Sequence, residues 1–159
     1  METETLHFRK ATKSDVDLYF EWTNDETVRE NSFETKPITL EEHYAWFYRK
    51  ILNSDCYFYL FLNKENVAVG QVRIEKVSGE ENYVIGISID KNFRGKSYGV
   101  QMLQLSTNDF LEHHPSSIIQ AFIKVENEIS HKIFVKAGFE NEEIVTIKES
   151  KSYKLYKSL

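Results

Sequence analysis

Apolar and polar residues alternate most regularly between residues 83 and 90. Ile85, Ile87 and Ile89 alternate there with small or polar residues, and this period of two predicts a β-strand with one apolar face. Further on, apolar positions recur at spacings of three and four, at Val100, Leu103, Thr107, Phe110 and Leu111. That spacing predicts an amphipathic helix. The two patterns predict a strand, a short basic turn and a helix in direct succession.

The same two spacings, alternation every second residue and recurrence every three or four, predict strands and helices in the rest of the chain. A strand at residues 6–9 precedes two helices, the first capped by Ser14 and the second by Thr39 with Glu42 three residues later. Residues 26–37 are polar and are expected to form a loop or a short helical turn. The side of each helix that faces the core is expected to carry Val16, Tyr19, Phe20 and Thr23 in the first helix, and Leu40, Tyr44, Phe47 and Ile51 in the second.

Further strands are expected at residues 56–62, 67–77, 118–125, 139–148 and 151–159, with a helix at residues 127–137. The order of elements is strand, two helices, three strands, helix, strand, helix and two strands. This order predicts an α/β (α+β) fold in which helices flank a mixed, mostly antiparallel central sheet. The 159 residues fit one domain, residues 1–159.

Composition narrows the classes of function. The chain is 41% hydrophobic and carries a net charge of -5, which fits a globular protein and argues against general nucleic-acid binding. Cys56 is the only cysteine, so neither an internal disulfide nor a cysteine-based metal site is expected. Residues 1–4 are acidic and do not resemble a signal peptide, and no apolar stretch is long enough for a membrane span. A cytoplasmic protein without metal is expected.

The basic turn at residues 94–99 is the first candidate for chemistry. It carries Arg94, Lys96 and two glycines just before a helix, where free backbone N–H groups and the helix dipole favour an anion. The nucleotide-triphosphate loop does not fit, because that motif requires a glycine where this chain has Asp90. An ordinary strand-to-helix turn with solvated basic residues remains the alternative.

Two motifs resemble those of the GCN5-related N-acetyltransferases, the GNAT superfamily. Residues 94–99 resemble its acetyl-CoA pyrophosphate loop, Q/R-x-x-G-x-G/A, with matches at Arg94 and Gly99 and a departure at Ser97, where glycine is usual. Residues 127–139 resemble its second motif, N-x-x-A/S-x-x-x-Y/F-x-K-x-G-F. The motifs stand in the family's order, and the resemblance covers nearly the whole chain. It implies a GNAT-like fold and acetyl-CoA as co-substrate.

The resemblance also implies roles for individual residues. Backbone groups of the strand are expected to hold the pantetheine arm and the acetyl group, the turn to hold the pyrophosphate, and a residue beyond a splay in the sheet to contact the pantetheine. These residues are Ile87, Ser88 and Ile89 in the strand, Arg94, Gly95, Lys96, Ser97, Tyr98 and Gly99 in the turn, and Asn127 across the splay. Phe134, in the second motif, is also expected to contact the cofactor.

Proton transfer is where the chain departs from the family. Phe134 stands where a tyrosine often donates a proton to the departing thiolate, and phenylalanine cannot do so. Either Tyr98 or Tyr153 replaces that acid, or the thiolate leaves unaided. For the base, Glu126 at a strand end could accept a proton through water, with Ser88 as a relay. A solvated carboxylate with no such role is the alternative for Glu126.

The acceptor is suggested by the N-terminal part. Residues 21–29 and 42–47 resemble acetyltransferases that act on nucleotide-linked amino sugars in pseudaminic acid synthesis, although ribosomal-protein N-acetyltransferases carry a similar Asn-Asp-x-x-Val-Arg segment. His43, Trp46 and Lys50 share a helix stripe that is expected to form either a wall of the substrate pocket or a packed helix flank. The expected function is acetyl transfer to a primary amine of such an amino-sugar nucleotide. The alternatives are a protein N-terminal acetyltransferase and a non-catalytic CoA-binding module, and a homodimer stays open.

Overall fold

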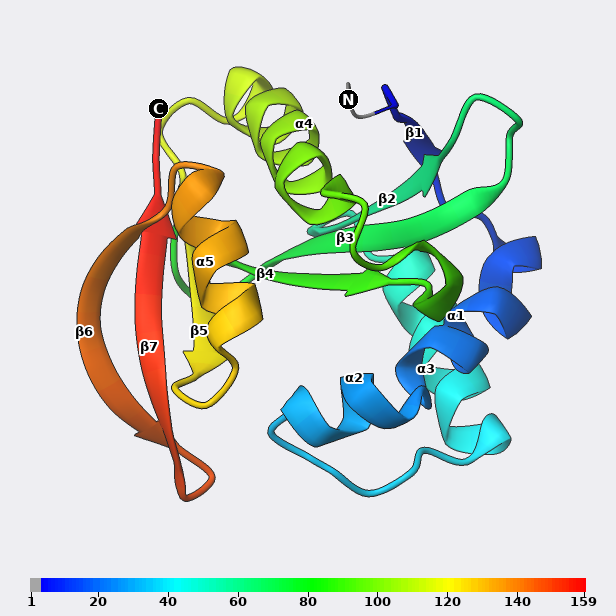
Figure 1. Cartoon of the computed structure of the whole chain (residues 1–159), viewed down its shortest axis with the longest axis horizontal. Coiled ribbons are helices and arrows are strands. Elements are labelled where there is room, and N and C mark those ends of the chain that lie inside the picture. The colour runs from blue at the N-terminus through cyan, green and yellow to red at the C-terminus, as the bar shows by residue number, and fades with distance from the viewer. Residues whose placement is uncertain (1–3) are drawn as a thin grey trace.

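The chain is described by a computed structural model that covers residues 4–159, apart from the side chain of Glu142. Seven strands form one sheet in the order β1-β2-β3-β4-β5-β7-β6 (Figure 1). Every neighbouring pair is antiparallel except β4 and β5, which run parallel. The expected α/β fold with a mixed, mostly antiparallel sheet and flanking helices is therefore confirmed.

The elements follow the predicted order closely. The strands are β1 His7–Lys10, β2 Cys56–Leu62, β3 Ala68–Lys76, β4 Asn82–Ile89, β5 Ile118–Lys124, β6 Glu140–Ile147 and β7 Ser150–Lys157. The helices are α1 Val16–Thr23, α2 Glu26–Asn31, α3 Leu40–Ile51, α4 Tyr98–His113 and α5 Glu128–Lys136. Within residues 4–159 no helix is long and apolar enough to cross a membrane.

Two apolar clusters lie on opposite faces of the sheet. On one face, α4 packs through Met102 and Leu103 with Val72 and Ile74 of β3. On the other face, α1 and α3 pack through residues such as Tyr19 and Phe47 against β2. The strict alternation of β4 explains this division, because each strand presents successive side chains to opposite faces. Its isoleucines join the α4 cluster, while Gly86 and Ser88 face the α1 and α3 side.

The sheet opens between β4 and β5. The two strands pair only from Asn82 opposite Ile118 to Val84 opposite Gln120. Beyond that point β4 continues along β3 and β5 continues along β7, and Figure 1 shows the two strands diverging. Residues 85–89 therefore have strand partners on the β3 side and none on the β5 side within the described chain. This is the splay that the sequence led us to expect.

The helix starts and stripes needed correction. Ser14 does not cap the first helix; the chain turns at Thr12, whose backbone N–H donates to the Asp15 carboxylate at 2.7 Å. In α3 three members of the expected stripe, Tyr44, Phe47 and Ile51, do pack into the core. Leu40, however, is 46% exposed, and His43 of the neighbouring stripe is buried. The buried face of α3 therefore extends toward His43, where the helix meets aromatic side chains of α1 and β2.

Candidate active site

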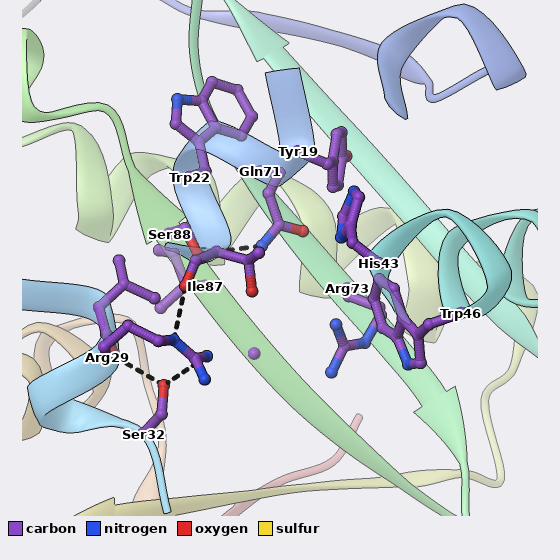
Figure 2. A pocket seen from close by; sticks show the side chains of 13 residues that line it. Tyr19, Trp22, Arg29, Ser32, His43, Trp46, Gln71, Arg73, Ile87 and Ser88 are labelled. Carbon is purple, nitrogen blue, oxygen red and sulfur yellow. Dashed lines mark hydrogen bonds between the residues drawn. The ribbon is translucent and has the colours of Figure 1, made fainter. Parts of the chain in front are cut away.

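A cavity of about 200 Å³ lies on the sheet face opposite α4. Its floor is formed by β3 and β4, and its walls come from α1, α2 and α3 (Figure 2). Gly86 and Ser88 of β4 face it, opposite Arg73 and Gln71 of β3 in the strand register. A Cβ placed on Gly86 would meet no atom within 4 Å. The small, polar face of the alternating strand thus becomes the floor of a pocket.

Two buried polar atoms in the cavity wall have no hydrogen-bond partner within the described chain. They are the Tyr19 hydroxyl and Gln71 Oε1. The Gln71 amide is oriented because its Nε2 donates to Ser88 Oγ at 3.2 Å, which leaves Oε1 for another donor. Burial raises the pKa of Tyr19, so its hydroxyl keeps its proton. An unsatisfied buried polar group costs about 1–3 kcal/mol, and this cost is typical of a site that a ligand completes.

His43 and Trp46 line the cavity from α3, whereas Lys50 does not. His43 Nε2 donates to the carbonyl of Val16 at 2.9 Å, and burial lowers the pKa of His43, so its ring is neutral near pH 7. Lys50 lies a turn further along and forms an ion pair with Glu75 at 2.8 Å. Of the three residues that share the predicted helix stripe, His43 and Trp46 therefore reach the cavity and Lys50 does not.

Two arginines that sequence reasoning did not single out also line the cavity. Arg29 of α2 donates from Nε to the Thr23 carbonyl at 2.6 Å and from Nη1 to the Glu34 carbonyl at 2.9 Å. Arg73 lies with its guanidinium 4.9 Å from the centre of the Trp46 ring. Figure 2 shows both guanidinium groups directed toward the same space. The sequence offered a signal only for Arg29, which belongs to the Asn-Asp-x-x-Val-Arg segment.

The turn before α4 has the backbone shape of an anion site. Gly95 and Ser97 both have positive φ angles, +76° and +63°, and α4 begins directly afterwards at Tyr98. Ser97 makes no side-chain capping bond, so amides of the first turn stay available. Gly95 and Lys96 are exposed. The φ of Ser97 explains why glycine is usual at this position, because L-residues rarely adopt this conformation.

Arg94 also makes contacts within the protein. Its Nη2 donates to Asp25 Oδ2 at 2.8 Å, and its Nε donates to the Ile89 carbonyl at 3.1 Å. The same Asp25 carboxylate accepts from the backbone N–H of Val28 and so caps α2. Next to it, Trp22 Nε1 donates to Asp90 Oδ2 at 2.9 Å. Arg94 thus fastens the turn to the helices that wall the cavity.

Three predicted cofactor residues, Tyr98, Gly99 and Phe134, are buried in the protein interior. The Tyr98 hydroxyl donates to Glu4 at 3.2 Å, and a Cβ on Gly99 would lie 3.1 Å from Ile133. Phe134 is 3% exposed and packs edge-on against Phe139. Tyr98 and Gly99 can therefore offer backbone amides to a ligand, while Phe134 belongs to the core.

The remaining predicted residues lie around the splay. Ile87 and Ser88 line the cavity, whereas Ile89 does not, and its carbonyl already accepts from Arg94. Asn127 Oδ1 accepts from the Ser130 N–H at 3.3 Å and caps α5. Glu126 is exposed in the turn between β5 and α5 and does not line the cavity.

Tyr153 stacks on His131, with ring centres 4.1 Å apart, and also lies outside the cavity wall. Within residues 4–159, leaving aside the Glu142 side chain, no cluster of His, Cys, Asp and Glu could hold a metal ion.

The family comparison fits this geometry. Residues 5–140 match the family described as the acetyltransferase (GNAT) domain, so the chain belongs to the GNAT acetyltransferases. The expectation of an acetyl-CoA-dependent acyltransferase is thereby confirmed at the level of the family. No curated protein matches the chain significantly.

Solved structures show the same fold at low sequence identity. The spermidine N-acetyltransferase from Vibrio cholerae, solved with CoA and spermine, has a TM-score of 0.86 at 14% identity, covering 96% of this chain and 95% of that one. The aminoglycoside acetyltransferase AAC(6')-Ib with coenzyme A and kanamycin has a TM-score of 0.80 at 17% identity, with 97% and 95% covered. A GNAT-family acetyltransferase from Bacillus anthracis has 0.78 at 20% identity, with 98% and 95% covered.

Proposed function

We propose that this chain transfers the acetyl group of acetyl-CoA to a primary amine of a small molecule, and that the amine belongs to a nucleotide-linked amino sugar. The observation that carries the proposal is the splay between β4 and β5. It frees backbone groups of β4 at the point where Gly86, Ile87 and Ser88 also border the cavity. A thioester held along this edge would meet an amine bound in the cavity.

The cofactor is proposed to bind along β4 from the turn to the cavity. The pyrophosphate would accept hydrogen bonds from amides at Gly95 to Gly99, at the start of α4, with Lys96 adding positive charge. The pantetheine would run beside Ile87 and Ile89, with Asn127 on the opposite side of the splay. Acetyl-CoA and acceptor would then approach Ser88 from different sides, as direct transfer requires.

The chain's contribution to the chemistry is mainly placement. The amine nitrogen attacks the thioester carbonyl, the C–S bond breaks, and the amine loses a proton. Holding two reactants in line can supply roughly 7–11 kcal/mol of the barrier. Because Phe134 cannot donate a proton, we propose that CoA leaves as the thiolate, which suits a thiol with a reference pKa of about 8.5. Glu126 acting through water and Ser88 as a relay remain the proposed proton acceptors.

The acceptor proposal draws on the cavity wall. Trp46 offers an aromatic face beside His43, and such faces pack well against rings of sugars or bases. Three helices and two strands contribute to the wall, which suits a compact ligand better than an extended peptide. The resemblance of residues 21–29 to amino-sugar-nucleotide enzymes points the same way.

An acceptor screen tests the proposal. Purified protein, acetyl-CoA and a panel of amines would be followed by detection of free thiol, with amino-sugar nucleotides, aminoglycosides, polyamines and peptides in separate wells. Turnover with an amino-sugar nucleotide at least tenfold above every peptide supports the full proposal. Efficient acetylation of peptides without turnover of any amino-sugar nucleotide would contradict the acceptor but keep the transferase.

A further inference from the structure

We infer that the acceptor carries an oxyanion, a phosphate or a carboxylate, which binds between Arg29 and Arg73 while the amine lies against Gln71 and Ser88. This inference rests on the proposed acetyl transfer and narrows its substrate class. It comes from the charges of the cavity wall. Of the 13 residues that line the cavity, all within the described part of the chain, two are arginines and none is aspartate or glutamate.

The charge of Arg29 is not neutralised where it lies. Its hydrogen-bond partners in the described chain are the carbonyls of Thr23, Glu34 and Lys36 and the hydroxyl of Ser32, all of which are uncharged. These bonds fix the guanidinium in place at the cavity wall. A fixed guanidinium surrounded by neutral groups is suited to an incoming anion, because charge-assisted hydrogen bonds are roughly twice as strong as neutral ones.

Arg73 offers free donors. Its guanidinium lies over Trp46 and makes no hydrogen bond or ion pair with any described residue. A stacked guanidinium keeps its in-plane N–H groups available, so it can bind a carboxylate or phosphate through two parallel hydrogen bonds. Figure 2 shows Arg73 and Arg29 reaching the cavity from different elements, as a clamp on one anionic group requires.

Nearby carboxylates offset this charge only in part. Asp25 is paired with Arg94 at 2.8 Å, and Asp90 accepts from Trp22 at 2.9 Å. Glu75, two residues beyond Arg73 on β3, is paired with Lys50; burial opposes its ionisation, but the bond from Lys50 and the charge of Arg73 lower its pKa. Glu75 therefore offsets part of the charge of Arg73, whereas Arg29 has only the uncharged partners named above. The cavity keeps a local positive charge within a chain whose net charge is -5.

The Gln71 side of the cavity suits an amine. Within the described chain, Gln71 Oε1 and the Tyr19 hydroxyl are buried without partners, and Gln71 Oε1 can only accept a hydrogen bond. An amine is a donor, and it would satisfy this atom beside Ser88, where the thioester is proposed to lie. Gln71 of β3 thus offers an acceptor for the amine, and Arg73 on the same face of β3 and Arg29 of α2 offer donors for an anion.

The same charges disfavour polycations. A polyamine or an aminoglycoside would bring several positive charges against two arginines, with no carboxylate in the wall to offset the repulsion. Two structural neighbours were solved with spermine and with kanamycin, so the fold itself accepts such ligands. The wall of this cavity, and not the fold, argues for a different acceptor here.

Matched pairs of amines test the inference. The probes are glucosamine with glucosamine 6-phosphate, and butylamine with 4-aminobutyrate, with spermidine as a polycation. We expect kcat/KM at least tenfold higher for the anionic member of at least one pair, and the pair that responds tells phosphate from carboxylate. Arg73→Gln should reduce this preference at least tenfold. Arg49→Gln should leave it unchanged, because Arg49 is an exposed residue of α3 that does not line the cavity.

A binding measurement gives a second readout. Both tryptophans of the chain, Trp22 and Trp46, line the cavity, so their fluorescence reports its occupancy. Inorganic pyrophosphate, titrated in the presence of saturating CoA, should change the emission, and Arg73→Gln should weaken this binding at least tenfold. Arg73→Lys keeps the charge but not the planar guanidinium, so its pyrophosphate affinity should lie between that of the parent protein and that of Arg73→Gln. An intermediate affinity would also show that the variants are folded.

The outcomes separate the two proposals. Equal kcat/KM within both pairs, or spermidine as the best acceptor, together with intact acetyl-CoA binding, would overturn the anion clamp and leave the transferase standing. No thiol release with any amine and no acetyl-CoA binding would overturn the proposed function. The pyrophosphate titration, repeated without CoA on the parent protein and on Arg73→Gln, would still decide whether Arg73 binds an anion.

Discussion

Asp25 and Arg94 join two parts of the chain that the proposed reaction must hold together. The Arg94 guanidinium donates to the Asp25 carboxylate at 2.8 Å, although 69 positions separate the two residues. Asp25 caps α2, which carries Arg29 to the cavity, and Arg94 belongs to the turn proposed to bind pyrophosphate. The pair therefore fixes the cavity wall formed by α2 relative to the turn at residues 94–99, while the contact of Trp22 with Asp90 does the same for α1.

Replacing this carboxylate should weaken the protein in a pH-dependent way. Burial opposes ionisation of Asp25, but hydrogen bonds from Arg94 and from the Val28 amide outweigh it, so the pKa of Asp25 is lowered. Because the folded-state pKa lies below that of the unfolded chain, about 3.9, the stabilisation is present above this value. It is lost as the pH falls through the folded-state pKa.

Asp25→Asn should therefore reduce the free energy of unfolding at pH 7 by about 1 kcal/mol, the upper range for a partly exposed pair. The difference from the parent should shrink in acid, which urea unfolding at a series of pH values would measure. Asp55→Asn, at an exposed position in the turn before β2, is the control. A loss that stays constant down to pH 3 would mean that the capping geometry, and not the charge, supplies the stability.

The turn before α4 allows a paired test of backbone conformation. Ser97 has a φ of +63°, and a left-handed conformation costs an L-residue about 1–2 kcal/mol, part of which the entropy of glycine offsets. Ser97→Gly should raise the free energy of unfolding by up to about 1 kcal/mol and preserve acetyl-CoA affinity. Gly95→Ala, at a φ of +76°, should lower both the free energy of unfolding and the affinity for acetyl-CoA.

Gly79→Ala is the matched control, since Gly79 has a φ of +77° in the turn between β3 and β4 and its Cβ would meet nothing. It should cost similar stability without changing acetyl-CoA affinity measured by calorimetry. If Gly79→Ala and Gly95→Ala reduced that affinity equally, the turn at residue 95 would have no special part in binding.

Trp46 offers a test of the acceptor wall. Trp46→Ala removes the aromatic face and leaves Arg73 without its stacking partner, 4.9 Å away. Aromatic and cation–π contacts of this kind contribute about 1–2 kcal/mol, so the KM for the acceptor should rise about tenfold. Acetyl-CoA affinity should change little, because Trp46 lies on α3, away from the turn at residues 94–99. An equal loss for both ligands would make Trp46 a packing residue only.

Gln71 offers a test of the unsatisfied buried oxygen. Gln71→Leu keeps a similar volume and removes Oε1, which has no partner in the described chain. Relief of that unsatisfied group should stabilise the free protein by up to about 1 kcal/mol, even though Ser88 loses its 3.2 Å hydrogen bond. Acceptor turnover should fall at least tenfold. Thermal unfolding and free-thiol release measure the two effects, and a variant with unchanged turnover would remove Gln71 from the site.

Local sequence patterns decided much of the fold and the turn before α4. The isoleucines of β4 predicted one apolar face, because alternation in a strand needs no knowledge of distant residues, and in the structure this face meets α4. Asn127 and Gly138 marked both ends of α5, and Ser130 N–H and a φ of +100° at Gly138 bear this out. Arg94 and Gly99 marked the strand-to-helix turn, since a short motif specifies its own backbone shape.

Which side chains line the cavity depends on contacts between elements that are distant in the sequence. His43 faces inward because aromatic side chains of α1 and α3 pack around it, and Lys50 pairs with Glu75 of β3, which only the folded chain brings close. Arg73 is one of several polar residues on β3, and it becomes part of the cavity only because α3 brings Trp46 beneath it. The role of Arg94 was likewise decided by Asp25, which only the folded chain brings within hydrogen-bond distance.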